Sequence, residues 1–305
     1  MALETPVALI IFKRADLTAQ VFEAIRRARP RRLFVIADGP RDESERARCA
    51  AARAVIDVDW DCELVTDYSE VNLGCKRRIV SGIDRVFEQC EEAIILEDDT
   101  LPSPSFFGFC HELLARWRGD LRIMNIAGTN LHPHPYPATR PETYFFARYG
   151  ITWGWATWRR AWKQLDVTLA DWPAFKRAGR MRNLFASRRE QLYWTLIFDA
   201  VHRGQLDSAW DYQWLFARLR NSGLSAVPAL NLVSNLGFRD DATHTRGGVP
   251  GYIARMQRHE LPALVHPIDV VPDLEVDRSY FAETFNLRGL AGLALSGLRR
   301  AAQPL

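Results

Sequence analysis

The chain of 305 residues lacks the features that mark several large classes of protein. It has five cysteines, all in its first half, and no two of them show the CxxC spacing of a zinc or redox site. An odd number of cysteines in this arrangement argues against a disulfide framework and is typical of a reducing compartment. We therefore expect a chain that folds around an apolar core without covalent cross-links.

Long apolar runs and a strong net charge are also missing. No stretch reaches the roughly 20 apolar residues that a membrane-spanning helix needs, and the first residues show no secretory signal. The formal net charge is only +3, which creates no strong field toward nucleic acid or membranes. These features predict a cytoplasmic protein, at most peripheral to the inner membrane, with no nucleic-acid partner.

What is present is an alternation of strand and helix patterns at the start of the chain. Residues 7–12 form a continuous apolar run, typical of a strand buried on both faces, and strand patterns recur at 33–37, 62–66 and 93–96. Helical patterns separate them, and this order predicts a parallel sheet with helices on its faces. Ligands bind such sheets beyond the carboxyl ends of the strands, so the residues that follow each strand are site candidates.

Three adjacent carboxylates, Glu97, Asp98 and Asp99, follow the fourth strand pattern directly. Such a cluster is costly unless a cation or hydrogen-bond donors neutralise it, and hard oxygen ligands select Mg²⁺ or Mn²⁺. In extended chain Glu97 and Asp99 point one way and Asp98 the other, so the triplet can serve a metal-bound diphosphate and a ribose. The alternative interpretation is a solvated acidic loop.

Other charged residues are expected on the same rim of the sheet. Asp38 ends the second strand, where a carboxylate can accept from a nucleobase or ribose, although an Asp-Gly-Pro turn explains it equally well. Arg14 follows the first strand, and a basic cluster of Lys76, Arg77 and Arg78 lies near the start of a helix, with Lys76 and Arg77 as the candidates. Basic residues at such positions can bind phosphates with the help of the helix dipole. The alternative is that they are ordinary solvent-exposed side chains, which is more common for isolated basic residues.

An ordered set of segments now stands out: 12–14 (Phe-Lys-Arg), 37–39 (Ala-Asp-Gly), 72–74 (Asn-Leu-Gly), 94–99 (Ile-Ile-Leu-Glu-Asp-Asp) and 102–107 (Pro-Ser-Pro-Ser-Phe-Phe). This set resembles an inverting nucleotide-sugar glycosyltransferase of the glycosyltransferase-A fold. It is similar to bacterial family-2-like enzymes and to the N-acetylglucosaminyltransferase I type. In the second group a Glu-Asp-Asp triplet after a strand is likewise followed by a Pro-x-Phe-Phe helix.

The resemblance implies an α/β protein with a Rossmann-like, mixed but mostly parallel sheet and helices on both faces. It implies a single catalytic domain over residues 1–245, with a nucleotide-binding half at 1–100 and an acceptor half at 101–245. Residues 246–305 would form a C-terminal extension. The apolar, basic tail of this extension is expected to be a plain helix or disordered, with weak membrane-surface association as the alternative.

The resemblance also implies roles for the candidate residues of the rim. Asp99 would ligate Mn²⁺ or Mg²⁺, Glu97 and Asp98 would lie near the nucleoside, and Asp38 would contact the base. Each of these assignments is chemically reasonable, because the departing diphosphate needs a cation to neutralise it. Arg14 and the two basic residues near the helix start would meet the phosphates.

On the acceptor side the resemblance implies that Asp211 is the general base that deprotonates the acceptor hydroxyl. Its neighbours Trp210 and Trp214 are expected to remove it from water, and a helix N-cap is the structural alternative. Asp171 is a rival for the role of base. His244, after the last strand pattern that fits the family, is either a ligand of the metal or diphosphate, or a structural histidine.

The expected function is transfer of a hexosyl or N-acetylhexosaminyl group from a UDP- or GDP-sugar to a hydroxyl of a glycan or glycoconjugate, in bacterial polysaccharide biosynthesis. A sugar-phosphate nucleotidyltransferase is one alternative, although residues 12–16 lack the Gly-rich loop of that class. A non-catalytic carbohydrate-binding protein of the same fold is another. Most of the ten tryptophans should pack in the core, with Trp153, Trp155 and Trp210 as the expected exceptions.

Overall fold

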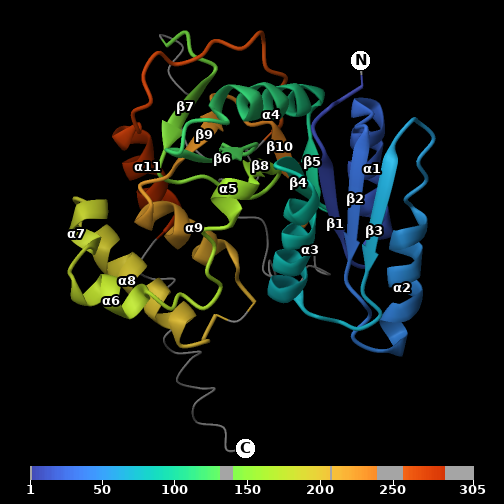
Figure 1. Ribbon diagram of the computed structural model, residues 1–305, viewed down its shortest axis with the longest axis horizontal. Coiled ribbons are helices and arrows are strands. Elements are labelled where there is room, and N and C mark those ends of the chain that lie inside the picture. The colour runs from blue at the N-terminus through green and yellow to red at the C-terminus, as the bar shows by residue number, and fades with distance from the viewer. Residues whose placement is uncertain (1, 131–139, 207, 239–256, 286–305) are drawn as a thin grey trace, which may run out of the picture.

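The computed structural model describes residues 2–130, 140–206, 208–238 and 257–285, and its centre is a mixed sheet (Figure 1). Within these residues the sheet has eight strands in the order β3-β2-β1-β4-β8-β6-β9-β7, and β5 pairs with β10 in a second, two-stranded sheet. The strands are β1 Val7–Ile11, β2 Arg32–Ala37, β3 Glu63–Tyr68, β4 Glu92–Glu97, β5 Thr100–Pro102, β6 Ile123–Ala127, β7 Tyr144–Ala147, β8 Trp155–Trp158, β9 Leu224–Pro228 and β10 Val233–Asn235.

The first half of the sheet is parallel, as the alternating pattern predicts. β1 lies between β2 and β4, and its partners in the two registers include Ala37 and Glu97. The carboxyl ends of these three strands therefore meet at one edge. The helices between them are α1 Ala15–Ala28, α2 Glu43–Ala54 and α3 Cys75–Gln89.

The continuous apolar run of β1 is explained by helices on both of its faces. Val7, Leu9 and Ile11 pack in a core that includes residues of α1. Ala8 and Ile10 pack in a second core with residues of α3. Because successive side chains of a strand point to opposite faces, a strand covered twice must be apolar at every position.

The second half makes the sheet mixed, because β8 runs antiparallel to both β4 and β6. β6 and β9 are parallel, and β7 closes the edge antiparallel to β9. The expected α/β class, a mixed and mostly parallel sheet with helices on both faces, is confirmed. The remaining helices are α4 Pro104–Trp117, α5 Arg159–Trp162, α6 Trp172–Arg177, α7 Met181–Leu184, α8 Arg188–His202, α9 Asp211–Arg220 and α11 Leu274–Thr284.

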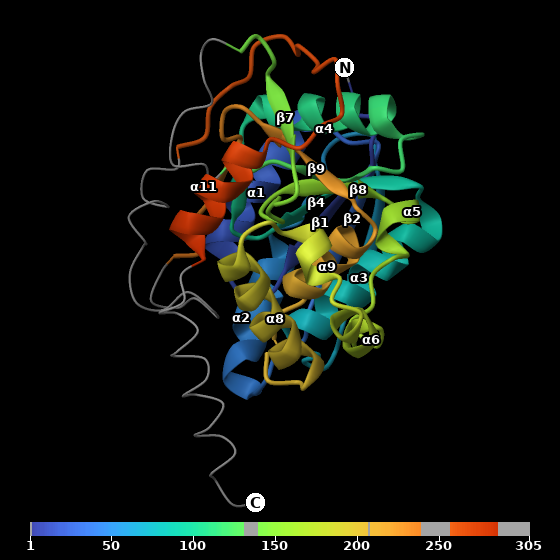
Figure 2. The ribbon, with the colours of Figure 1, turned by 90° about the vertical axis from the view of Figure 1, so that its left-hand side faces the viewer.

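A separate group of helices covers the end of the sheet away from β3. Helices α6, α7, α8, α9 and α11 share an aromatic core, and Figure 2 shows α8 and α9 side by side. The segment before α11 also packs on the main sheet, since Pro272 forms a bridge with Phe146. The division at residue 245 stays a prediction, although residues 257–285 pack closely on the rest.

The tryptophans follow the expectation only in part. Trp155 and Trp210 are buried in the core that α3 covers, so their expected exposure to a ligand is wrong. Both lie in a cluster of indole rings with Trp162 and Trp214, at centroid distances of 5.5–6.0 Å. Trp153 keeps an accessible face.

Two expectations fall on residues outside the described ranges. These are the role of His244 and the membrane contact of the tail at 286–305. Across the ranges that are described, no helix combines the length and the apolar character that crossing a membrane requires.

Candidate functional site

A cleft of about 350 Å³ opens where the carboxyl ends of β1, β2 and β4 meet, and we call it the rim cleft. Its position follows from the register, which brings the residues after three strands to one edge. Five of the residues singled out from the sequence line it, namely Arg14, Asp38, Glu97, Asp98 and Asp99. The structure thus brings together side chains from the ends of three strands.

Arg14 is the cation that pairs with two carboxylates of the acidic triplet, those of Asp98 and Asp99. Its Nη2 lies 2.8 Å from Oδ2 of Asp99, and it also bonds Oδ1 of Asp98. Its Nε lies 3.4 Å from Asp98 Oδ2, which also accepts from the backbone N–H of Phe12 at 3.4 Å. Burial lowers the pKa of Arg14, but the charges and hydrogen bonds of Asp98 and Asp99 together outweigh it and raise that pKa above its usual value. Asp98 is therefore a buried partner that holds Arg14 against the sheet.

One guanidinium does not balance three carboxylates. Burial, together with the negative charges of Asp99 and Asp98, raises the pKa of Glu97 to about 8. Burial also raises the pKa of Asp98 to about 6, against the lowering effect of Arg14. Three carboxyl groups thus crowd beside the guanidinium of Arg14, and a bound cation would favour their ionised forms.

The donor atoms fit a divalent ion held jointly with phosphate. Among the described residues, no group of three or more His, Cys, Asp or Glu side chains forms a complete protein cage for a metal. Mg²⁺ typically uses one or two carboxylates together with substrate phosphates, and Glu97 and Asp99 are of the right chemistry. The backbone that follows β10 lies against Asp99, because Leu236 N donates to the carbonyl oxygen of Asp99 at 2.8 Å. A side chain at Gly237 would lie 2.1 Å from Asp99 Oδ2.

Asp38 is buried and already bound by the protein. Its two oxygens accept from Gly39 N and Leu73 N at 2.9 Å, and from Gly74 N and Asn72 Nδ2 at 3.0 Å. Three of these bonds hold the loop at 72–74 that precedes α3, and the bond from Gly39 lies within the Asp-Gly-Pro segment, so the carboxylate has a structural role. Its contact with a nucleobase stays a prediction.

The basic residues of α3 are placed differently from the expectation. Lys76 and Arg77 are not among the residues that line the rim cleft, whereas their neighbour Arg78 is. Arg78 is 5% exposed and reaches Asp67 Oδ2 at 2.8 Å. The helical spacing indicates this position, because Arg78 lies one turn before the buried Gly82 and therefore shares its face of the helix.

Arg41 is a second basic residue of the cleft that the sequence did not single out. Its guanidinium lies 5.9 Å from the ring centre of Phe12, and Lys13 lies 5.3 Å from the same ring. Both cations pair with Glu45, which is buried at the start of α2. The hydrogen bond from Arg41, followed by that from Lys13, holds the pKa of Glu45 far below its usual range despite opposing desolvation.

Asp211 is the first residue of α9 and is exposed, and Trp210 is the N-cap residue. Trp210 and Trp214 turn into the core, so these indole rings do not cover the carboxylate and that expectation is wrong. The charge of Asp211 nevertheless raises the pKa of Glu97, so the two acidic groups share one electrostatic environment. The rival Asp171 pairs with Arg220 at 2.7 Å. It lines neither the rim cleft nor the second cavity, which Asp211 borders.

Asp211 lines a second cavity of about 180 Å³, which we call the aromatic cavity. Its ring-bearing lining residues are Tyr149, Trp153, Trp194, Tyr212, Tyr280 and Phe285. Trp153 also lines the rim cleft, so one indole side chain borders both spaces.

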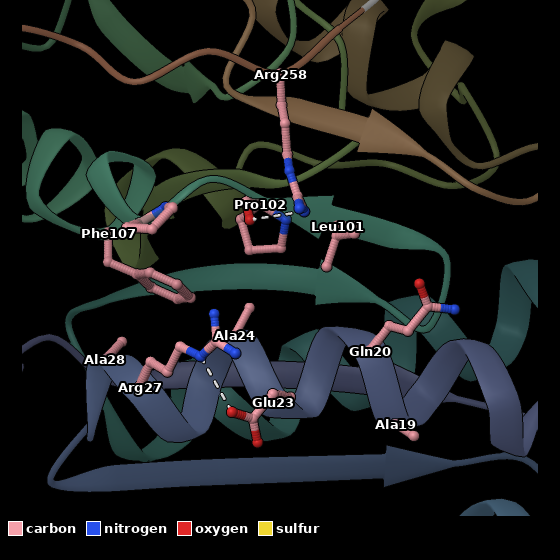
Figure 3. A pocket seen from close by; sticks show the side chains of 11 residues that line it. Ala19, Gln20, Glu23, Ala24, Arg27, Ala28, Leu101, Pro102, Phe107 and Arg258 are labelled. Atoms are coloured by element: carbon pink, nitrogen blue, oxygen red, sulfur yellow. Dashed lines mark hydrogen bonds and ion pairs between the residues drawn. The ribbon is translucent and has the colours of Figure 1, made fainter.

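A groove of about 500 Å³ runs along the outer side of α1 and has a different character. Figure 3 shows Arg258 reaching down to Pro102 above the helix, where Glu23 pairs with Arg27 at 3.0 Å. The carboxylate among its lining residues is thus already paired. The groove contains none of the triplet, and the rim cleft remains the candidate site.

Comparison with known proteins assigns no family. No protein-family model matches the chain, and no curated protein matches it. A mannosyltransferase, PcManGT from Pyrobaculum calidifontis in complex with GDP-Man and Mn²⁺, is similar with a TM-score of 0.40 and 14% identity, over 72% of this chain and 75% of its own. A UDP-glucose pyrophosphorylase complexed with UDP-glucose gives a TM-score of 0.26 and 9% identity, over 42% of this chain and 63% of its own. Likenesses this weak define no activity for this chain.

Proposed function

We propose that this chain is a divalent-metal-dependent glycosyltransferase of the glycosyltransferase-A fold, acting on a nucleotide-diphosphate sugar in the rim cleft. The observation that carries the proposal is the excess of carboxylate at the ends of the parallel strands. Glu97 and Asp99 line a cleft that is large enough for a ligand, and together with Asp98 they place three carboxyl groups beside the guanidinium of Arg14. A divalent cation would supply positive charge there, and a diphosphate bound to it would place a nucleotide where α/β sheets bind their ligands.

The residues then divide the work of transfer. Asp99 and Glu97 would hold Mn²⁺ or Mg²⁺, which when bound neutralises charge on the leaving diphosphate. Asp98 keeps Arg14 in place beside them. Asp211 accepts the proton of the acceptor hydroxyl, and attack from the side opposite the diphosphate inverts the configuration of the sugar.

We propose a UDP- or GDP-linked hexose or N-acetylhexosamine as donor, and a glycan or glycoconjugate hydroxyl as acceptor, in cytoplasmic synthesis of a bacterial polysaccharide. Lys76 and Arg77 are retained as proposed phosphate contacts on the helix that borders the cleft, and Asp38 as the contact of the base. A bacterial family-2-like enzyme, similar to the N-acetylglucosaminyltransferase I type, remains the proposed relationship.

A sugar-phosphate nucleotidyltransferase is the second candidate, because it binds the same class of nucleotide. The segment that joins β1 to α1 contains no glycine and is only three residues long, from Phe12 to Arg14. This disfavours the phosphate-cradling loop that nucleotidyl transfer uses. The products separate the two candidates, since glycosyl transfer releases a nucleoside diphosphate and nucleotidyl transfer forms or consumes pyrophosphate.

The test is a thermal-shift measurement with UDP, GDP and dTDP, each with and without Mn²⁺. The wild-type protein should be stabilised by one nucleotide only when Mn²⁺ is present, and Asp99→Ala should lose that shift. Asp61→Ala is the matched control, because this side chain is fully exposed and should leave the shift unchanged. An Asp99→Ala variant that keeps the full Mn²⁺-dependent shift would remove the metal from this site.

A further inference from the structure

The aromatic cavity has a lining that the proposed nucleotide site does not use. Four of its ring-bearing residues, Trp153, Tyr212, Tyr280 and Phe285, are only partly buried and present accessible surface. Tyr149 and Trp194 form its deeper wall, at 5% and 0% exposure. Flat, partly solvated aromatic faces suit a ligand that has one apolar face and polar edges.

The wall of this cavity is held rigidly by two buried charges of opposite sign. Asp277 of α11, fully buried, accepts from the backbone N–H of Arg148 at 3.1 Å and of Tyr149 at 3.3 Å. Arg218 of α9, 2% exposed, donates to the carbonyl of Arg148 at 3.3 Å and of Gly150 at 3.0 Å. The segment is therefore fixed from both sides, and the cavity wall is preorganised.

Close packing reinforces this wall from below. A side chain at Gly150 would lie 2.2 Å from Ser225 Oγ, so the backbone rests directly on β9. Thr129 Oγ1 donates to the carbonyl of Trp153 at 2.6 Å, which fixes the far end of the same segment. The side chain of Trp153 thus projects from a backbone that is anchored at both ends.

The chemistry of the lining argues for one class of ligand. Among the lining residues that the structure describes, Arg218 is the one basic side chain, and it already donates to two carbonyl groups. The lining therefore offers little positive charge with which to bind a phosphate or a carboxylate. A pyranose ring has apolar C–H faces that pack on aromatic rings and hydroxyls that remain hydrated at its edge.

We propose that the aromatic cavity is the acceptor subsite, and that it holds the pyranose ring of a saccharide against Tyr212 and Tyr280. The inference rests on the proposed function for its orientation, because Asp211 lines the cavity and Trp153 borders both the cavity and the rim cleft. A hydroxyl of the bound ring lies beside the proposed base and faces the donor. The acceptor is then a saccharide unit, and a lipid phosphate or an amino-acid side chain is excluded.

The test measures saccharide binding without donor or metal. Saturation-transfer NMR is recorded with the methyl glycosides of glucose, galactose, mannose and N-acetylglucosamine, on wild-type protein and on two variants of one residue. Tyr280→Leu removes the flat ring and should weaken binding roughly fivefold to tenfold, whereas Tyr280→Phe keeps the ring and should retain it. Tyr212→Leu and Tyr212→Phe form a second pair in case the first leucine variant is unstable.

The outcomes separate this inference from the proposed function. If no methyl glycoside receives saturation, or if both leucine variants bind as wild type, the saccharide subsite is refuted. The Mn²⁺-dependent nucleotide shift, measured on the same samples, tests the donor site independently. Glycoside binding without any nucleotide shift would keep the saccharide site and refute its role as an acceptor subsite.

Discussion

The clamp on the wall of the aromatic cavity allows a quantitative prediction. Asp277 is fully buried and bonds Arg148 three times, through the side-chain Nε at 2.8 Å and the backbone N–H at 3.1 and 3.3 Å. The change Asp277→Ala removes the carboxylate that pairs with an Arg148 guanidinium only 18% exposed and that accepts from the amide of Tyr149; the guanidinium keeps its bond to the Leu184 carbonyl. Removing one partner of a buried ion pair costs about 3–5 kcal/mol, so the free energy of unfolding should fall by about that amount.

A double-mutant cycle with Arg148→Met tests the origin of this loss. The methionine removes the charge that Asp277→Ala leaves unpaired, so the double variant should be less destabilised than the sum of the two single variants. The coupling should be about 1–3 kcal/mol, because the two residues are in direct contact. Urea unfolding followed by far-UV circular dichroism gives the free energies, provided that the transition is two-state.

The matched control lies at the exposed ion pair between Asp59 and Arg26, whose atoms are 3.4 Å apart. Asp59→Ala should change the stability by no more than about 0.5 kcal/mol. If Asp277→Ala costs no more than this control, or if the cycle shows no coupling, the clamp does not hold the wall and the preorganisation argument fails.

Two further predictions concern the proposed base and the wall of the rim cleft. Asp211→Asn should keep the Mn²⁺-dependent nucleotide shift and lower the transfer rate at least about 100-fold, as measured by nucleoside diphosphate release; a variant with full turnover moves the base elsewhere. Glu45→Gln should destabilise the protein at pH 7. Arg41 is the main cause of the lowered pKa of Glu45, and a carboxylate with a lowered pKa stabilises the fold at pH values above its ordinary pKa. That loss should shrink as the pH falls below the ordinary value of 4.5; urea unfolding midpoints that differ equally at all pH values contradict it.

The sequence was sufficient for the frame of the sheet and the rim of the site. The apolar run of β1 predicts a strand because both of its faces meet helices, and the triplet after β4 lies where the register requires. Both inferences use only neighbouring residues and the geometry of parallel strands. They hold because local pattern and tertiary packing demand the same side chains.

Other features depend on contacts between distant parts of the chain, and they could not be predicted from the sequence. The oxygens of Asp38 are bound by the loop at 72–74, which no local pattern links to β2. The inward direction of Trp210 depends on the indole cluster with Trp155, which comes from another element. Arg78 belongs to the basic cluster seen in the sequence but was not chosen from it, because the phase of the helix decides which of the three adjacent basic residues lines the cleft.

The clamp by Asp277 also sets an order of events during synthesis of the chain. The three parallel strands whose ends form the rim cleft are complete at Glu97, whereas Asp277 lies 180 positions later (277 minus 97). At typical translation rates this interval lasts roughly 10 to 40 seconds. The nascent chain can therefore pair the strands of this sheet edge well before Asp277 binds the wall of the aromatic cavity. A ribosome-bound chain that ends before α11 should carry that edge without the finished wall opposite it.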